Sequence, residues 1–104
     1  MTHYELDEED KKLRTVELTA RERTLLLRYG YPWPDVAERL RGSKAVKGFH
    51  HVPINEYWIE MMQADIVRSA KEIKSSALLE ELDALCSALD CALENRPRIH
   101  LVSM

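Results

Sequence analysis

Apolar residues recur at intervals of three and four over the second half of the chain, which is the spacing of an amphipathic helix. Between Asn55 and Arg96 this spacing occurs in two stretches, which are separated by Ser75-Ser76. Two such helices joined by a short turn pack antiparallel to one another. The pattern therefore predicts a C-terminal antiparallel helical hairpin, around which the rest of the chain is organised.

The second helix of this hairpin has a leucine-rich side between Leu78 and Leu93 that is wider than one antiparallel partner covers. A helix predicted from Thr19 to about Tyr29 is the obvious second partner. A second copy of the chain is the competing one, because a wide apolar side that stays uncovered marks an interface. A homodimer through the leucine-rich helix is therefore one expectation.

The first half of the chain predicts shorter elements. Thr15–Leu18 alternates polar and apolar residues, as does Phe49–Ile54, where Pro53 restricts the second strand to a sheet edge. Thr19-x-x-Glu22 is a capping-box pattern that begins a helix, and a second short helix covers Pro34–Arg41. We therefore predict a mainly α fold, a small helical domain, with a short two-stranded β ribbon if the two strands pair.

Length and composition favour one globular domain of 104 residues with 45% apolar and 32% charged residues. We place this single helical domain at residues 15–96, between a flexible acidic tail (1–14) and a C-terminal tail (97–104) that alternates weakly. The net charge of -3 gives no general attraction to nucleic acid or anionic membranes. No apolar run has the roughly 18 residues of a membrane span, and the N-terminus lacks a secretory signal pattern. We therefore expect a cytoplasmic protein.

The most distinctive local stretch is Tyr29-Gly30-Tyr31-Pro32-Trp33-Pro34. Its two prolines prevent a regular helix and present large aromatic side chains on a stiff turn. Two interpretations remain open: the turn is a corner that fills the core, or it is a platform that binds a partner. For the second interpretation, the partner-binding residues are Tyr31, Trp33, Phe49 and Trp58.

Catalytic chemistry has weak support in this sequence. His50 and His51 are adjacent, so on a strand they point to opposite faces and cannot share one metal ion. Asp65 lies at the apolar stripe of its helix, with Arg68 one turn later as a partner. An acid–base site would have to combine these histidines with Asp65. The chain contains none of the common phosphate, nucleophile or zinc motifs, so we expect no cofactor, no metal and no enzyme activity.

Three segments carry a family resemblance: Leu18-Thr19-Ala20-Arg21-Glu22-Arg23, Val36-Ala37-Glu38-Arg39-Leu40 and Ser43-Lys44-Ala45-Val46-Lys47. Together they resemble the helix-turn-helix of LuxR-type transcription regulators. The resemblance implies a DNA-binding role, in which the third segment enters the recognition helix and Lys44, Lys47 and His50 meet DNA. Residues 20–50 carry seven basic and three acidic residues, which is a local excess of positive charge.

These observations order three hypotheses about function. The first is a protein-interaction or regulatory module without a catalytic site, which acts through a protein partner or through self-association. The second is a helix-turn-helix DNA-binding regulator. The third is an enzyme with a site near His50, His51 and Asp65.

Overall fold

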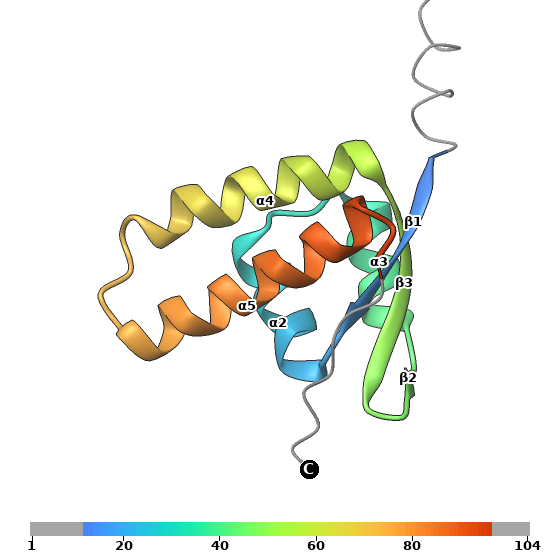
Figure 1. Ribbon diagram of the computed structural model, residues 1–104, viewed down its shortest axis with the longest axis horizontal. Helices are drawn as coiled ribbons and strands as arrows, with labels where there is room; N and C mark the ends of the chain where they lie inside the picture. Colours follow the sequence, from blue (N-terminus) through green and yellow to red (C-terminus); the bar gives the residue numbers. More distant parts are fainter. Residues whose placement is uncertain (1–11, 97–104) are drawn as a thin grey trace, which may run out of the picture.

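The computed structural model describes residues 12–96. The elements in chain order are β1 (Leu13–Leu18), α2 (Ala20–Tyr29), α3 (Pro34–Gly42), β2 (Ala45–Val46), β3 (Phe49–Asn55), α4 (Glu56–Ala70) and α5 (Ser76–Leu93). In Figure 1 the helices α4 and α5 extend away from the sheet as a hairpin, with their connecting turn at the far end. Most of the predicted acidic tail and all of the predicted C-terminal tail lie outside the described residues.

The prediction of a mainly α fold was wrong, because the described residues form a three-stranded antiparallel sheet beside four helices, an α+β fold. The strand order is β1-β3-β2. β1 pairs with β3 from Leu13 opposite Asn55 to Leu18 opposite His50, and β2 pairs with the start of β3. The third strand, β2, comes from a segment for which we predicted no strand. A strand of two residues is too short to show the alternation that predicts strands.

One face of the sheet is buried and the other meets solvent. Val16 and Leu18 on β1, and Val52 and Ile54 on β3, are fully buried in the hydrophobic core. The residues between them, among them His51, are exposed or half-buried. This alternation is the period of two that the sequence showed, and it fixes which face of the sheet the helices cover.

Pro53 was predicted to restrict its strand to an edge, yet β3 is the central strand. The difference is explained by the length of β2, which ends before it reaches Pro53. Along the second half of β3 only β1 is paired, so the other side of the strand is a local edge. The carbonyl of Pro53 points to that open side, where the Arg39 Nη1 group of α3 donates a hydrogen bond to it at 3.1 Å. A proline is tolerated there because no partner strand needs its missing N–H.

The hairpin of α4 and α5 is present, and its leucine side is covered from three directions. Leu82, Leu85 and Leu89 are buried in the core, and α5 packs against β1, α4 and α2. The predicted partners α4 and α2 both take part, whereas the contact with β1 was not predicted. A homodimer through α5 stays a prediction. Within one chain, most of the leucine side of α5 is already buried against other elements.

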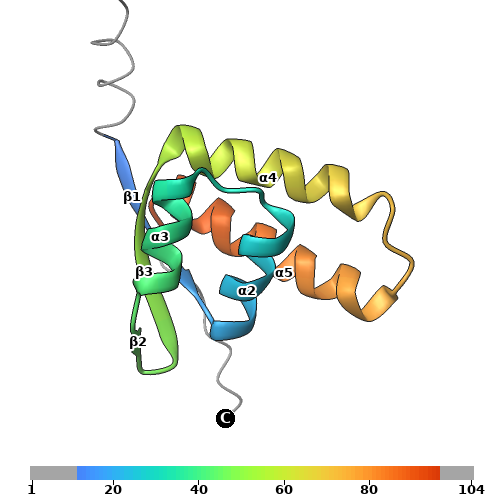
Figure 2. The same ribbon diagram turned by 180° about the vertical axis from the view of Figure 1, so that it is seen from behind.

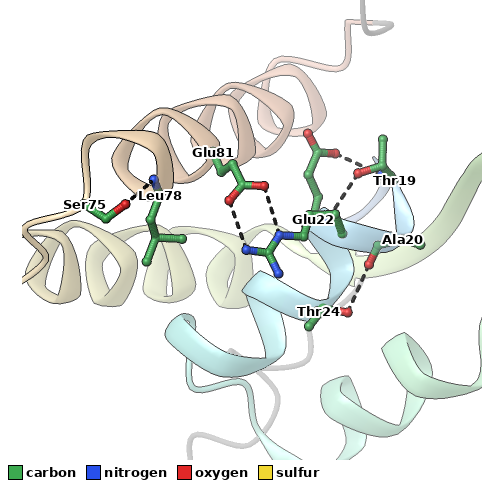
Figure 3. Close-up of polar contacts among 8 residues, drawn as sticks. Thr19, Ala20, Glu22, Thr24, Ser75, Leu78 and Glu81 are labelled. Atoms are coloured by element: carbon green, nitrogen blue, oxygen red, sulfur yellow. Dashed lines mark hydrogen bonds and ion pairs between the residues drawn. The ribbon is translucent and has the colours of Figure 1, made fainter.

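The beginning of α2 follows the predicted capping box (Figure 3). The Thr19 hydroxyl accepts from the backbone N–H of Glu22 at 3.1 Å, and the Glu22 carboxylate accepts from the backbone N–H of Thr19 at 3.0 Å. In the same turn, Arg21 donates two hydrogen bonds to Glu81 of α5, at 2.9 and 3.0 Å. This ion pair lowers the pKa of Glu81, chiefly through its hydrogen bond with Arg21. Together these contacts set where α2 begins and attach it to the hairpin.

Candidate functional site

The connection from α2 to α3 passes α4 (Figure 2), and both segments carry exposed aromatic side chains. Trp33 and Trp58 have ring centroids 5.1 Å apart, and the rings of Tyr57 and Trp58 meet nearly edge to face at 4.8 Å. We call the group formed by Tyr31, Trp33, Tyr57, Trp58 and Met61 the aromatic face. Two segments that are distant in sequence therefore build one surface.

The sequence forces the first of these segments out of helix. Gly30 caps α2, with its N–H donating to the Leu26 carbonyl at 2.9 Å. Tyr31 then adopts a positive φ of 49°, which is uncommon for a residue other than glycine. Trp33 has extended backbone angles as the residue that precedes α3, and Pro34 opens that helix. The turn thus holds Tyr31 and Trp33 in fixed positions on the surface.

The second segment is the first two turns of α4. Tyr57 and Met61 are four residues apart and so lie on one side of the helix. Trp58 is half-buried, since it packs against the hydrophobic core while its ring contacts Trp33. The α4 helix therefore anchors the aromatic face to the core through Trp58 and exposes the remaining rings.

The exposure of these side chains decides between the two interpretations of the aromatic turn. The exposed fraction is 68% for Tyr31, 56% for Trp33 and 43% for both Tyr57 and Met61. Tyr29 alone among the aromatics of the turn packs against the core. Large apolar groups that gather on the surface in this way are unusual for a protein that works alone. The turn is therefore a surface feature, not a corner that fills the core.

Two of the four predicted partner-binding residues, Trp33 and Trp58, contact each other. Tyr31 comes two residues before Trp33 and lines a hollow with Asp65 and Arg68 of α4. Phe49 does not join Tyr31, Trp33 and Trp58, because it is the first residue of β3 whereas α4 begins after the last. Seven residues of strand separate its position from α4 by about 20 Å. Tyr57 and Met61 were missed as surface groups. The apolar character of Met61 does not distinguish it from the buried residues of α4, and only its exposure shows that it lies at the surface.

The residues proposed for DNA lie at the β2–β3 hairpin. Lys47 and Gly48 both have positive φ, 56° and 87°, as a tight two-residue hairpin turn requires. Lys44 and Lys47 are exposed, whereas His50 is buried. The His50 Nδ1 atom lies 3.0 Å from the Ser43 hydroxyl, which also donates to the Leu40 carbonyl at 2.8 Å. The two lysines are thus open to a ligand, and His50 is a buried part of the hairpin base.

Contacts from α2 fix this hairpin base against α3. The Arg23 Nη1 group donates to the Leu40 carbonyl at 3.2 Å and to the Ser43 carbonyl at 3.4 Å. A guanidinium at the carboxyl end of a helix also meets the negative end of the helix dipole. Arg23 therefore links α2, the end of α3 and the start of the hairpin.

The three residues of the catalytic hypothesis have separate partners. The His51 Nε2 atom lies 3.2 Å from the Glu17 carboxylate on the solvent face of the sheet, and His50 contacts Ser43. Asp65 forms an ion pair with Arg68, the partner that the sequence indicated. Within residues 12–96 no group of three histidine, cysteine or acidic side chains is arranged to hold a metal ion.

The two cysteines of α5 are unpaired and half-buried. Burial raises the pKa of the Cys86 thiol, and the carboxylates of Asp90 and Asp83 raise it further. A thiol of this kind stays protonated at neutral pH and is a poor nucleophile. Cys86 therefore has the properties of a packing residue.

In the described part of the chain, none of the helices has the length and apolar character needed to cross a membrane. Comparisons with protein-family models, with curated proteins and with solved structures found no match to this chain.

Proposed function

We propose that this protein is an interaction module that docks a partner protein through its aromatic face. The observation that carries the proposal is the exposure of Trp33 and Tyr57, whose rings both contact Trp58, with Tyr31 and Met61 exposed in the same two segments. Tryptophan and tyrosine are the side chains that most often dominate binding energy at protein interfaces, because each buries a large rigid area. We place this module in the cytoplasm, where its unpaired cysteines stay reduced.

The stiffness of the turn supports the same function. Pro32 and Pro34 fix the backbone on both sides of Trp33, and the Trp33 ring contacts the ring of Trp58. A partner would therefore meet side chains that are already ordered. Such preorganisation lowers the entropy cost of association.

Photo-crosslinking in the cell that makes the protein tests this proposal. A photoreactive phenylalanine analogue replaces Tyr31 in one version of the chain and the exposed residue Ser87 of α5 in a control version. We expect a discrete adduct from position 31 and none from position 87. Adding Trp33→Ser should abolish the adduct, whereas Val46→Ser, which removes an exposed apolar side chain on another surface, should leave it. Equal labelling from positions 31 and 87 would contradict the proposal.

A second candidate function, binding of duplex DNA, has its own observation. α2 and α3 are joined by only residues 30–33, and the β2–β3 hairpin follows directly. Two helices joined by a short turn with glycine form the helix-turn-helix unit, whose second helix reads the major groove. Arg41, Lys44 and Lys47 are exposed along the end of α3 and the hairpin. In this arrangement α3 is the second helix, while Ser43–Lys47, which the LuxR resemblance assigns to that helix, contains β2.

The salt dependence of DNA binding tests the second candidate. A protein loses about 0.9 from the slope of log affinity against log salt for each phosphate contact removed. Lys44→Ala with Lys47→Ala should therefore flatten the slope for a generic duplex by about 2, measured by fluorescence anisotropy. The matched control is Lys71→Ala with Lys74→Ala, which removes the same charge near the α4–α5 turn. An equal slope in both double variants would rule out hairpin contacts with phosphate.

A further inference from the structure

One edge of the sheet is formed by β1, because the strand order is β1-β3-β2. Thr15 of β1 lies opposite Pro53, which has no N–H to donate, so the backbone groups of Thr15 point away from β3. The hydrogen bond from the Glu56 N–H to the Lys12 carbonyl, at 3.1 Å, fits this alternation, since Lys12 lies an odd number of residues before Thr15. Leu13, two residues before Thr15, therefore also points its backbone groups outward.

These outward groups have no strand to pair with in the described part of the chain. Within residues 12–96, β1 pairs with β3 alone, and no other backbone group bonds to Leu13 or Thr15. An edge of this kind is an attachment site for another extended chain, so natural proteins cover it or block it.

A groove of about 270 Å³ lies beside this edge, between β1 and the end of α5. Figure 1 shows α5 ending close to β1, against which it packs. The wall from β1 includes Leu13 and Thr15, and the wall from α5 includes Ala88, Cys91 and Ala92. The small side chains of α5 leave room for larger apolar side chains from a strand added at the edge.

The chain itself supplies a segment at the right place and of the right length. Asn95 and Arg96, the last described residues, line the groove, and residues 97–104 follow them. An extended chain of that length spans about 26 Å, whereas the six residues of β1 span about 20 Å. The segment is therefore long enough to follow β1 from one end to the other.

The composition of this segment matches a strand with one buried face. Arg98 and His100 are polar, and they alternate with the apolar Ile99 and Leu101. The N-terminal residues lack this pattern, since residues 5–10 contain five acidic residues and one leucine. The C-terminal segment is thus the better candidate to fill a groove with apolar walls.

We propose that residues 98–102 occupy this groove as a fourth strand of the sheet, hydrogen-bonded to the outward backbone groups of Leu13 and Thr15. Ile99 and Leu101 then point to the small side chains of α5. Arg98 and His100 point to the solvent face of the sheet, where the Glu17 carboxylate lies beside His51. The end of the chain closes the edge of its first described strand, and this inference is independent of the aromatic face.

Amide hydrogen exchange of the full-length protein, followed by NMR, tests this proposal. The amides of Leu13 and Thr15 should exchange more than about tenfold slower than unprotected amides, because a backbone partner must open first. Nuclear Overhauser contacts should also join the Thr15 N–H to residues 98–102. Both measurements use the unaltered chain, so they do not depend on whether a variant folds.

Two double variants separate the apolar side of the segment from its polar side. Ile99→Ser with Leu101→Ser removes the buried side chains and should speed exchange at Leu13 and Thr15 by at least about tenfold. Arg98→Ser with His100→Ser is the matched control and should change it by no more than about twofold, since exposed ion pairs contribute little. The amide of Val52 on β3 should stay protected in both variants, which shows that the sheet is intact.

Several outcomes would overturn the proposal. Unprotected exchange at Thr15 in the unaltered chain would mean that the edge is open. Protection without contacts to residues 98–102, or an equal effect of the two double variants, would assign the cover to another segment. Protection that rises with protein concentration would identify a second copy of the chain as the occupant.

Discussion

Replacing Gly30 with alanine is expected to destabilise the fold through a steric clash at the end of α2. A β-carbon at this position would lie 2.8 Å from both the Leu26 carbonyl oxygen and the Leu26 Cδ1 atom, and 3.4 Å from the Met62 Cβ atom. The carbonyl oxygen cannot withdraw easily, because it already accepts the Gly30 N–H at 2.9 Å. The Leu26 side chain is fully buried, so it has no free space to rotate into. The backbone itself is right-handed there, with φ at −91°, so an alanine adds no torsional strain.

The size of the effect follows from the cost of overpacking. Inserting a methyl group into a packed interior costs about 2 kcal/mol. For a domain of this size that free energy lowers the melting temperature by about 10 °C. We expect urea unfolding, followed by tryptophan fluorescence, to show a lower midpoint with an unchanged m-value.

Gly42→Ala is the matched control for this substitution. Gly42 is the last residue of α3, and a β-carbon there would meet nothing within 4 Å. Alanine restricts the unfolded chain, so this variant should be unchanged or up to about 1 kcal/mol more stable. If Gly30→Ala proved as stable as Gly42→Ala, α2 and α4 would not approach each other as closely as described.

Three further substitutions test the fold. Thr19→Ala should lower the free energy of unfolding by about 1 kcal/mol in urea titrations, and adding Glu22→Ala should cost less than the sum of the two single changes, because both belong to one capping box. Leu89→Ala should lower the free energy of unfolding by about 3 kcal/mol, since Leu89 is fully buried. A loss below about 1 kcal/mol would mean that neighbouring side chains move in to fill the cavity. Arg21 lowers the pKa of Glu81 in the folded state, so the pair adds stability above the ordinary glutamate pKa of 4.5 and loses it as the pH falls further. The melting temperatures of wild type and Arg21→Ala should therefore differ at pH 7 and converge below pH 4.5, and a constant difference would count against the ion pair.

Local features of the fold were predictable from the sequence, whereas its sheet was not. The capping box at Thr19, the end of α2 at Gly30 and the pairing of Asp65 with Arg68 follow from chemistry over three or four residues. The pairing of β1 with β3 joins segments about 40 residues apart, and alternation in each segment does not identify its partner. For this reason we predicted only a two-stranded ribbon, on the condition that the two strands pair, and we did not predict its contact with α5.

The aromatic face was only partly predictable for a related reason. The size of Tyr31 and Trp33 and the stiffness from the neighbouring prolines could be inferred from the sequence. Their exposure depends on how closely the turn approaches α4, and that is a property of the packed chain. Phe49 was grouped with them by residue type alone, and the length of β3 places it elsewhere.

The position of β1 in the fold determines when the protein can complete its folding during synthesis. β1 is made before the other elements of the described chain, yet it pairs with β3 and packs against α5, the last helix of the described chain. Such distant contacts slow folding, because a long loop must close before they form. Until α5 has left the ribosome, the buried residues of β1 lack part of their cover and are open to association with other chains. Truncation within α5 should therefore affect the whole domain, including the α2–α3 turn, which is more than 40 residues away from α5 in the sequence.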